Sequence, residues 1–75
     1  MSVPTYLSPD AFLADLFKTR SARRGGIVRR QRRDIERYVG LEPFLQDMRR
    51  RGFTVVANAD QLVIFCNREP LRRLT

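Results

Sequence analysis

Eight basic side chains lie between positions 18 and 33 of this 75-residue chain, with no acidic residue among them. Guanidinium groups form paired hydrogen bonds with phosphate oxygens and keep their charge at physiological pH. A block of like charge repels itself unless an acidic surface is nearby, and nucleic acid is the commonest such surface. Phosphate binding is therefore the first chemistry that the sequence suggests. The eight residues are Lys18, Arg20, Arg23, Arg24, Arg29, Arg30, Arg32 and Arg33.

Helical phase gives part of this block a pattern. At about 100° per residue, the apolar residues of segment 27–39 fall in one arc and its arginines in the opposite one. The pattern predicts an amphipathic helix with a phosphate-binding face. We expect the main contacts from Arg29, Arg30, Arg32, Arg33 and Arg37, and secondary ones from Arg23, Arg24, Arg49, Arg50 and Arg51. The alternative is a solvated helix face that Asp34 and Glu36 partly neutralise.

Other chemistries have little support in the composition. The chain has no histidine, which is the usual general base and the commonest metal ligand. Cys66 is the only cysteine, so a cysteine-based zinc site and a disulfide are both excluded. Cys66 shares a predicted strand face with Leu62 and Ile64, which indicates a small buried side chain, and a redox role stays open. We expect no catalysis, no metal and no cofactor.

The length allows one small domain, covering residues 1–75, with segments 1–7 and 68–75 loosely ordered. The formal net charge is +7, and arginine supplies most of the basic residues. A lone thiol is typical of a reducing compartment, so we expect a cytoplasmic protein. No apolar stretch approaches the ~20 residues of a membrane span, and the first residues lack the order of a signal peptide.

The elements that must position the arginines begin with a helix near residues 9–22. Ser8 is a good N-cap, Pro9 suits the first helical position, and Leu7 and Phe12 have the spacing of a hydrophobic staple. The pair Gly25-Gly26 should end this helix, and a helix break explains it better than a phosphate-binding loop does.

Two further helices are predicted near 27–39 and 43–51, the second with Gly52 as its C-terminal cap. The chain then changes to β-branched and aromatic residues, which predicts a hairpin with strands at 53–57 and 61–66. A two-stranded hairpin is marginal alone and must pack on the helices. The predicted fold class is therefore α+β, with three helices followed by an antiparallel hairpin.

This order resembles the end of a winged-helix domain, so we tested for a helix-turn-helix. With Gly40 at the ninth position of that motif, Ile35, Val39 and Leu41 take their expected apolar positions. The later apolar residues, Leu45 and Met48, are one position out of register. The pattern favours two packed helices over a helix that reads DNA bases.

Three blocks carry a resemblance to other proteins. The sequences GGIVRR (25–30), RRRGF (49–53) and VIFCNR (63–68) are similar to those of a group of short basic alphaproteobacterial proteins of unknown function. The likeness covers most of the chain from Leu7 onward. It implies a small bacterial cytosolic protein, and it assigns a function to no residue.

We therefore expect a small regulatory or nucleic-acid-binding protein, not an enzyme, that contacts the phosphates of DNA or RNA through its arginines. The alternative is an adaptor that binds an acidic protein or forms a homodimer through its apolar hairpin. An adaptor would have an exposed apolar patch or an open strand edge beside the charge.

Overall fold

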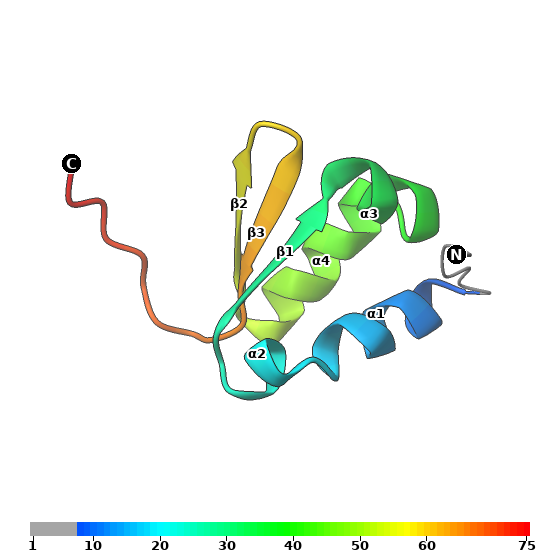
Figure 1. Cartoon of the computed structure of the whole chain (residues 1–75), viewed down its shortest axis with the longest axis horizontal. Helices are drawn as coiled ribbons and strands as arrows, with labels where there is room; N and C mark the ends of the chain where they lie inside the picture. The colour runs from blue at the N-terminus through cyan, green and yellow to red at the C-terminus, as the bar shows by residue number, and fades with distance from the viewer. Residues whose placement is uncertain (1–7) are drawn as a thin grey trace.

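Four helices and a three-stranded antiparallel sheet make up the computed structural model, which describes residues 8–75 (Figure 1). The predicted α+β class is confirmed. The helices are α1 (Pro9–Phe17), α2 (Arg20–Arg23), α3 (Arg32–Tyr38) and α4 (Leu41–Arg51). The strands are β1 (Ile27–Gln31), β2 (Thr54–Asn58) and β3 (Gln61–Phe65).

The first predicted helix is divided in two. As predicted, the Ser8 hydroxyl accepts a hydrogen bond from the backbone N–H of Ala11 at 3.1 Å, and Pro9 opens α1. The single helix predicted over 9–22 is wrong at Lys18 and Thr19, where α1 ends and α2 begins. Thr19 causes the break, because its hydroxyl donates to the Leu16 carbonyl at 2.9 Å and accepts from Ala22. The proposed staple involves Leu7, which lies outside the described residues.

The helix predicted over 27–39 is wrong in its first third. Residues 27–31 form β1, and only Arg32–Tyr38 are helical. β1 pairs with β3 along its whole length, from Ile27 opposite Phe65 to Gln31 opposite Gln61. This long-range ladder outweighs the helical period of the segment, and the β-branched pair Ile27-Val28 suits a strand. Arg29 and Arg30 therefore lie on a strand and not on the predicted helical face.

The remaining elements agree with the sequence predictions within two residues. α4 begins at Leu41, two residues earlier than predicted, directly after Gly40. It ends at Gly52, whose φ of +79° is the left-handed conformation that glycine adopts without strain. β2 and β3 form the predicted hairpin around Ala59 and Asp60.

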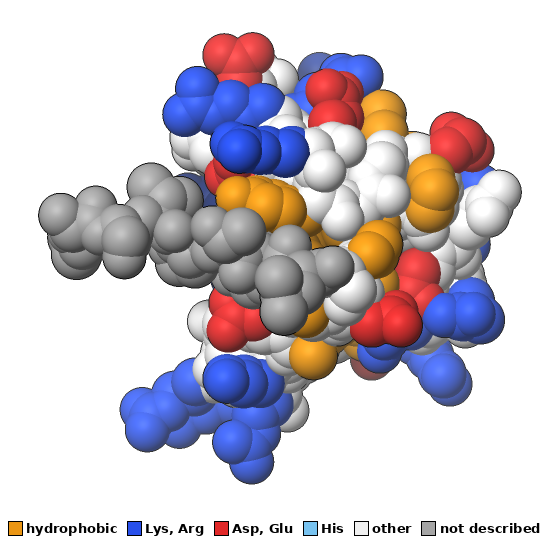
Figure 2. Space-filling model, turned by 90° about the vertical axis from the view of Figure 1, so that its right-hand side faces the viewer, with side chains coloured by type: hydrophobic (Ala, Val, Ile, Leu, Met, Phe, Trp, Pro, Cys, Tyr) orange, Lys and Arg blue, Asp and Glu red, His pale blue; other side chains and the backbone are white. Residues whose placement is uncertain are grey.

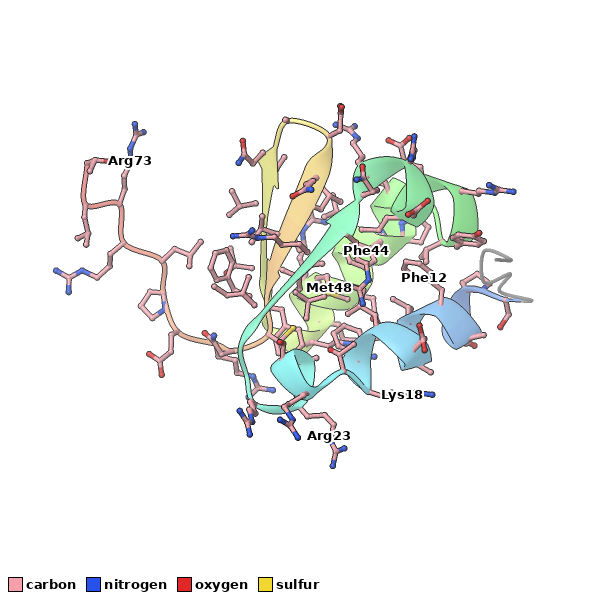
Figure 3. The ribbon with its side chains drawn as sticks, in the orientation of Figure 1. Phe12, Lys18, Arg23, Phe44, Met48 and Arg73 are labelled. Atoms are coloured by element: carbon pink, nitrogen blue, oxygen red, sulfur yellow. The ribbon has the colours of Figure 1, made fainter. Side chains whose placement is uncertain are left out.

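The sheet order is β1-β3-β2, so the third strand that the sequence analysis missed lies beside the hairpin. One sheet face packs on the helices, and Figure 3 shows Phe12, Phe44 and Met48 between the ribbons of α1, α4 and the sheet. The core residues are Phe12, Leu16, Val28, Ile35, Phe44, Met48, Leu62, Ile64 and Cys66. The core thus fixes β1, the centre of the basic block, against the helical layer.

Apart from the extra turn α2, the elements follow in the order helix, strand, helix, helix, strand, strand, and β3 is the central strand of the sheet. Residues 68–75 contain no helix or strand and are exposed, and Figure 1 shows them extending away from the sheet.

Candidate nucleic-acid interface

The basic block follows one edge of the sheet. It begins at Lys18, directly after α1, continues through α2 and along β1, and ends in the first turn of α3. We call its eight side chains the basic belt: Lys18, Arg20, Arg23, Arg24, Arg29, Arg30, Arg32 and Arg33. The five residues of β1 alone extend over about 16 Å, a length that carries about nine phosphates in duplex DNA. Figure 3 shows Lys18 and Arg23 at the α2 end.

The local structure of α2 and its turn places the first part of the belt. Gly25 turns the chain with a φ of +73°, and Gly26 donates a backbone hydrogen bond to the Ser21 carbonyl at 2.7 Å. These contacts fix α2 beside the start of β1. An open groove of about 460 Å³ lies between them, lined by Thr19, Ser21, Ile27, Val28, Arg29 and Arg30.

Most of the belt arginines are not neutralised. Five of them are exposed or nearly so and form no ion pair with any residue in the described part of the chain: Arg20, Arg23, Arg24, Arg29 and Arg33. Their guanidinium groups are therefore available to an external anion. The belt is thus a surface of free positive charge, in contrast to a set of internal salt bridges.

The other three belt residues have contacts within the chain. Lys18 lies 4.0 Å from the Asp15 carboxylate, and Arg32 donates to Glu36 at 2.8 Å. All four side chains are about half exposed or more, so water screens both pairs and neither holds its cation firmly. The Arg30 guanidinium donates to the Arg29 carbonyl at 2.7 Å, which places a charge on the free edge of β1.

Two of the predicted contributors have a structural role. Asp47 is buried, with 8% of its surface exposed, and accepts hydrogen bonds from Arg50 and from Arg51, the latter at 2.9 Å. The Arg51 guanidinium also lies over the Phe17 ring, 4.2 Å from its centroid. Arg50 and Arg51 therefore neutralise a buried carboxylate on α4, and they are poor candidates for phosphate contact.

The last two predicted residues, Arg37 and Arg49, are exposed but lie outside the belt. The Arg37 guanidinium lies 5.5 Å from the centroid of the Tyr38 ring. Arg49 is on α4, and it forms no ion pair with a described residue. From the side that Figure 2 shows, basic groups are separated by acidic and hydrophobic side chains. The arginines that were predicted as one helical face are thus divided between the strand β1 and the helix α3.

In a helix-turn-helix the second helix of the pair contacts the DNA bases. The second helix of the α3–α4 pair, α4, carries little net positive charge. Its charged residues are the acids Glu42 and Asp47 and the bases Arg49, Arg50 and Arg51, so three bases against two acids leave a net charge of +1. The turn of the hairpin contains Asp60 and no basic residue. The positive charge that is free of ion pairs is therefore concentrated around α2, β1 and the first turn of α3, and not on α4.

Cys66 is buried at the end of the central strand, with 5% of its surface exposed, as the sequence predicts. Burial raises the pKa of its thiol, and the positive charges of Arg30 and Arg51 lower it to a smaller extent. A raised pKa keeps the thiol protonated and unreactive at neutral pH. The local environment of Cys66 is that of a packing residue.

Two belt residues, Lys18 and Arg20, are not among the predicted contact residues. The signal was available, because both belong to the same acid-free run. The helix predicted over 27–39 set the main contact residues apart from this first part of the run. With β1 in place of that helix, α2 and the strand form one charged edge.

Comparison with known proteins gives no match: no protein-family model fits the chain, and no curated protein or solved structure is significantly similar to it. Across residues 8–75, no helix has the length and apolar character needed to cross a membrane.

Proposed function

We propose that the protein binds nucleic acid through phosphate contacts made by the basic belt. The observation that carries this proposal is the set of exposed belt arginines that form no internal ion pair. A charged edge of this kind attracts a polyanion from a distance and gives an affinity that falls steeply with salt. Phosphate contacts position a protein on its ligand but do not read sequence, so binding should be largely independent of base sequence.

The distribution of charge favours the belt over α4 as the contact surface. A reading helix needs basic or amide side chains on an exposed face to reach the base edges. α4 offers Gln46 and Arg49 there, beside the acid Glu42, while Asp47 holds the next two arginines. The order of the elements alone is therefore a weaker argument than the free charge along β1.

A second candidate function is an adaptor that binds an acidic protein segment. The groove beside β1 supports it, because an extended acidic segment could lie there next to Arg29 and Arg30. The same belt would attract its carboxylates. Competition separates the two functions: an acidic peptide that displaces nucleic acid only at far higher concentration supports the nucleic-acid proposal.

The test is a salt titration of binding to duplex DNA, single-stranded DNA and structured RNA, followed by fluorescence anisotropy. A triple variant, Arg23→Ala/Arg24→Ala/Arg29→Ala, removes three free belt charges. For duplex DNA we expect the slope of log K against log salt to become shallower by about 2 to 3, because each phosphate contact contributes about 0.9.

The matched control is Arg49→Ala/Arg72→Ala/Arg73→Ala, which removes the same charge from exposed arginines outside the belt. The control should keep a slope close to that of the wild type. Equal slopes for the two triple variants would contradict a localised belt. Absence of binding to all three ligands at about 50 mM salt would contradict the proposed function itself.

A further inference from the structure

The two edge strands of the sheet are protected to different degrees. On β1, Arg29 and Arg30 carry charge at the edge, and the Arg30 guanidinium covers the Arg29 carbonyl. On β2, the sequence Thr54–Asn58 contains no charge and no proline. Charged side chains and prolines are the usual means by which an edge strand avoids pairing with another chain. β2 lacks both of them.

The hydrogen-bond pattern shows which backbone groups of β2 point outward. The backbone N–H of Cys66 donates to the Gly26 carbonyl at 2.9 Å, so the backbone N–H and C=O groups of the even-numbered residues of β3 point toward β1. The backbone groups of the odd-numbered residues of β3 therefore point toward β2, where they pair with Thr54, Val56 and Asn58. The N–H and C=O groups of Val55 and Ala57 consequently point away from the sheet.

An apolar row crosses the sheet face opposite the helices and ends at this edge. Arg29 lies opposite Val63, and Val63 lies opposite Val56. Val56 is 40% exposed, and Ile27 on the same sheet face is 49% exposed. The row therefore ends in the charged Arg29 at the β1 edge and in the exposed Val56 at the β2 edge.

We propose that two copies of the chain associate through β2, with the two strands antiparallel about a two-fold axis at Val56. In this register, Val55 of one copy and Ala57 of the other exchange both of their outward hydrogen bonds. The two Val56 side chains then lie opposite each other on the outer face. A six-stranded sheet results, in which four valines form a continuous row with an arginine at each end.

The position of the basic belt favours pairing of the second copy with the β2 edge over pairing with the β1 edge. Each chain has a net charge of +7, so two copies repel each other wherever their arginines approach. Pairing through β2 places the two basic belts at the two far ends of the joined sheet. The β2 edge is the edge of the sheet that lies furthest from the basic belt.

This proposal does not depend on nucleic-acid binding, and salt distinguishes the two. Salt screens the repulsion between the copies, so association should strengthen as salt increases, whereas phosphate binding weakens. A five-residue edge buries less than the roughly 800 Å² per partner of a standard interface, so we expect a dimer at micromolar or higher concentration.

The experiment is sedimentation equilibrium of the nucleic-acid-free chain over a concentration series from micromolar to millimolar. The test variant is Val56→Lys, which puts two lysines opposite each other in the dimer, and we expect its dissociation constant to rise about tenfold or more. The matched control is Ile27→Lys, which adds the same charge to the same sheet face on β1. The control should leave the dissociation constant within about threefold of the wild type.

A second variant tests the backbone contacts. Ala57→Pro removes one outward N–H and leaves the β3 ladder intact, so it should also weaken association. Circular dichroism establishes that each variant is folded. A wild-type chain that stays monomeric throughout the series would overturn the proposal. Equal weakening by Val56→Lys and Ile27→Lys would also overturn it, because association would then use the whole outer face and not the β2 edge.

Discussion

The substitution Asp47→Asn tests the structural role that we assign to Arg50 and Arg51. Asp47 is the buried carboxylate of α4, and both arginines donate to it from the following turn. Asparagine keeps the size and one acceptor oxygen of this side chain but removes its charge. If the two arginines hold this carboxylate, its loss must lower the free energy of unfolding.

The structure sets the expected size of this effect. A hydrogen bond to a charged group contributes about 1.5–3 kcal/mol when it is buried. The side chains of Arg50 and Arg51 are 78% and 41% exposed, so water screens both contacts. We therefore expect a loss of about 1–2 kcal/mol, which in a domain of this size lowers the Tm by about 4–16 °C.

The assay is thermal and urea unfolding followed by far-ultraviolet circular dichroism. The control is Glu69→Gln, which removes the same charge from an exposed residue of the tail. The control should be indistinguishable from the wild type. If Asp47→Asn changed the free energy of unfolding by less than about 0.5 kcal/mol, the size of a typical surface substitution, the assigned structural role would be refuted.

Two further predictions concern Cys66 and Gly52. Because burial raises the pKa of the Cys66 thiol, its contribution to stability is complete below the unfolded value of about 8.5 and is lost as pH rises through the folded value. Urea unfolding between about pH 7 and 10 should therefore show a steeper loss of stability for the wild type than for Cys66→Ala, and parallel profiles would contradict this. Gly52→Ala should destabilise the chain by about 1–2 kcal/mol in thermal unfolding, because φ is +79° and the new Cβ would lie 3.1 Å from the Arg68 side chain. Gly52→Asn should cost less, since asparagine tolerates the left-handed conformation, and an equal cost for both would refute the conformational explanation.

The features that the sequence predicts correctly are those that short-range interactions determine. Ser8 and Pro9 start a helix through their own side chains, and Gly52 ends one through its backbone freedom. The hairpin follows from two β-branched runs that a short turn separates. Each of these signals lies within a few residues of the structure that it specifies.

The missed strand depends on residues that are distant in sequence. Ile27 pairs with Phe65, and residues 27–31 become a strand only because β3 offers them its second edge. The apolar residues of segment 27–39 do recur with a helical period, but only the part that forms α3 is helical. Local patterns could not decide between these structures, because the deciding hydrogen bonds join two segments that are far apart in the sequence.

In the candidate site, too, the sequence predicts the local features and misses those that depend on tertiary packing. The acid-free basic run is visible in the sequence, and it remains the main feature of the surface. The i+3 and i+4 spacing of Arg50 and Arg51 from Asp47 was a usable signal for ion pairs. The burial of Asp47, which makes those pairs structural, follows from the packing of α4 and could not be read from spacing.

The most direct test of phosphate binding by the basic belt is to observe arginine side-chain Nε–Hε signals by NMR during titration with a short oligonucleotide. We predict that the signals of the free belt arginines, Arg20, Arg23, Arg24, Arg29 and Arg33, shift as the ligand binds. The signals of Arg50 and Arg51 should stay in place, because Asp47 holds both side chains. Shifts confined to α4, or an oligonucleotide that moves no belt signal, would contradict the assignment of the belt as the phosphate-binding surface.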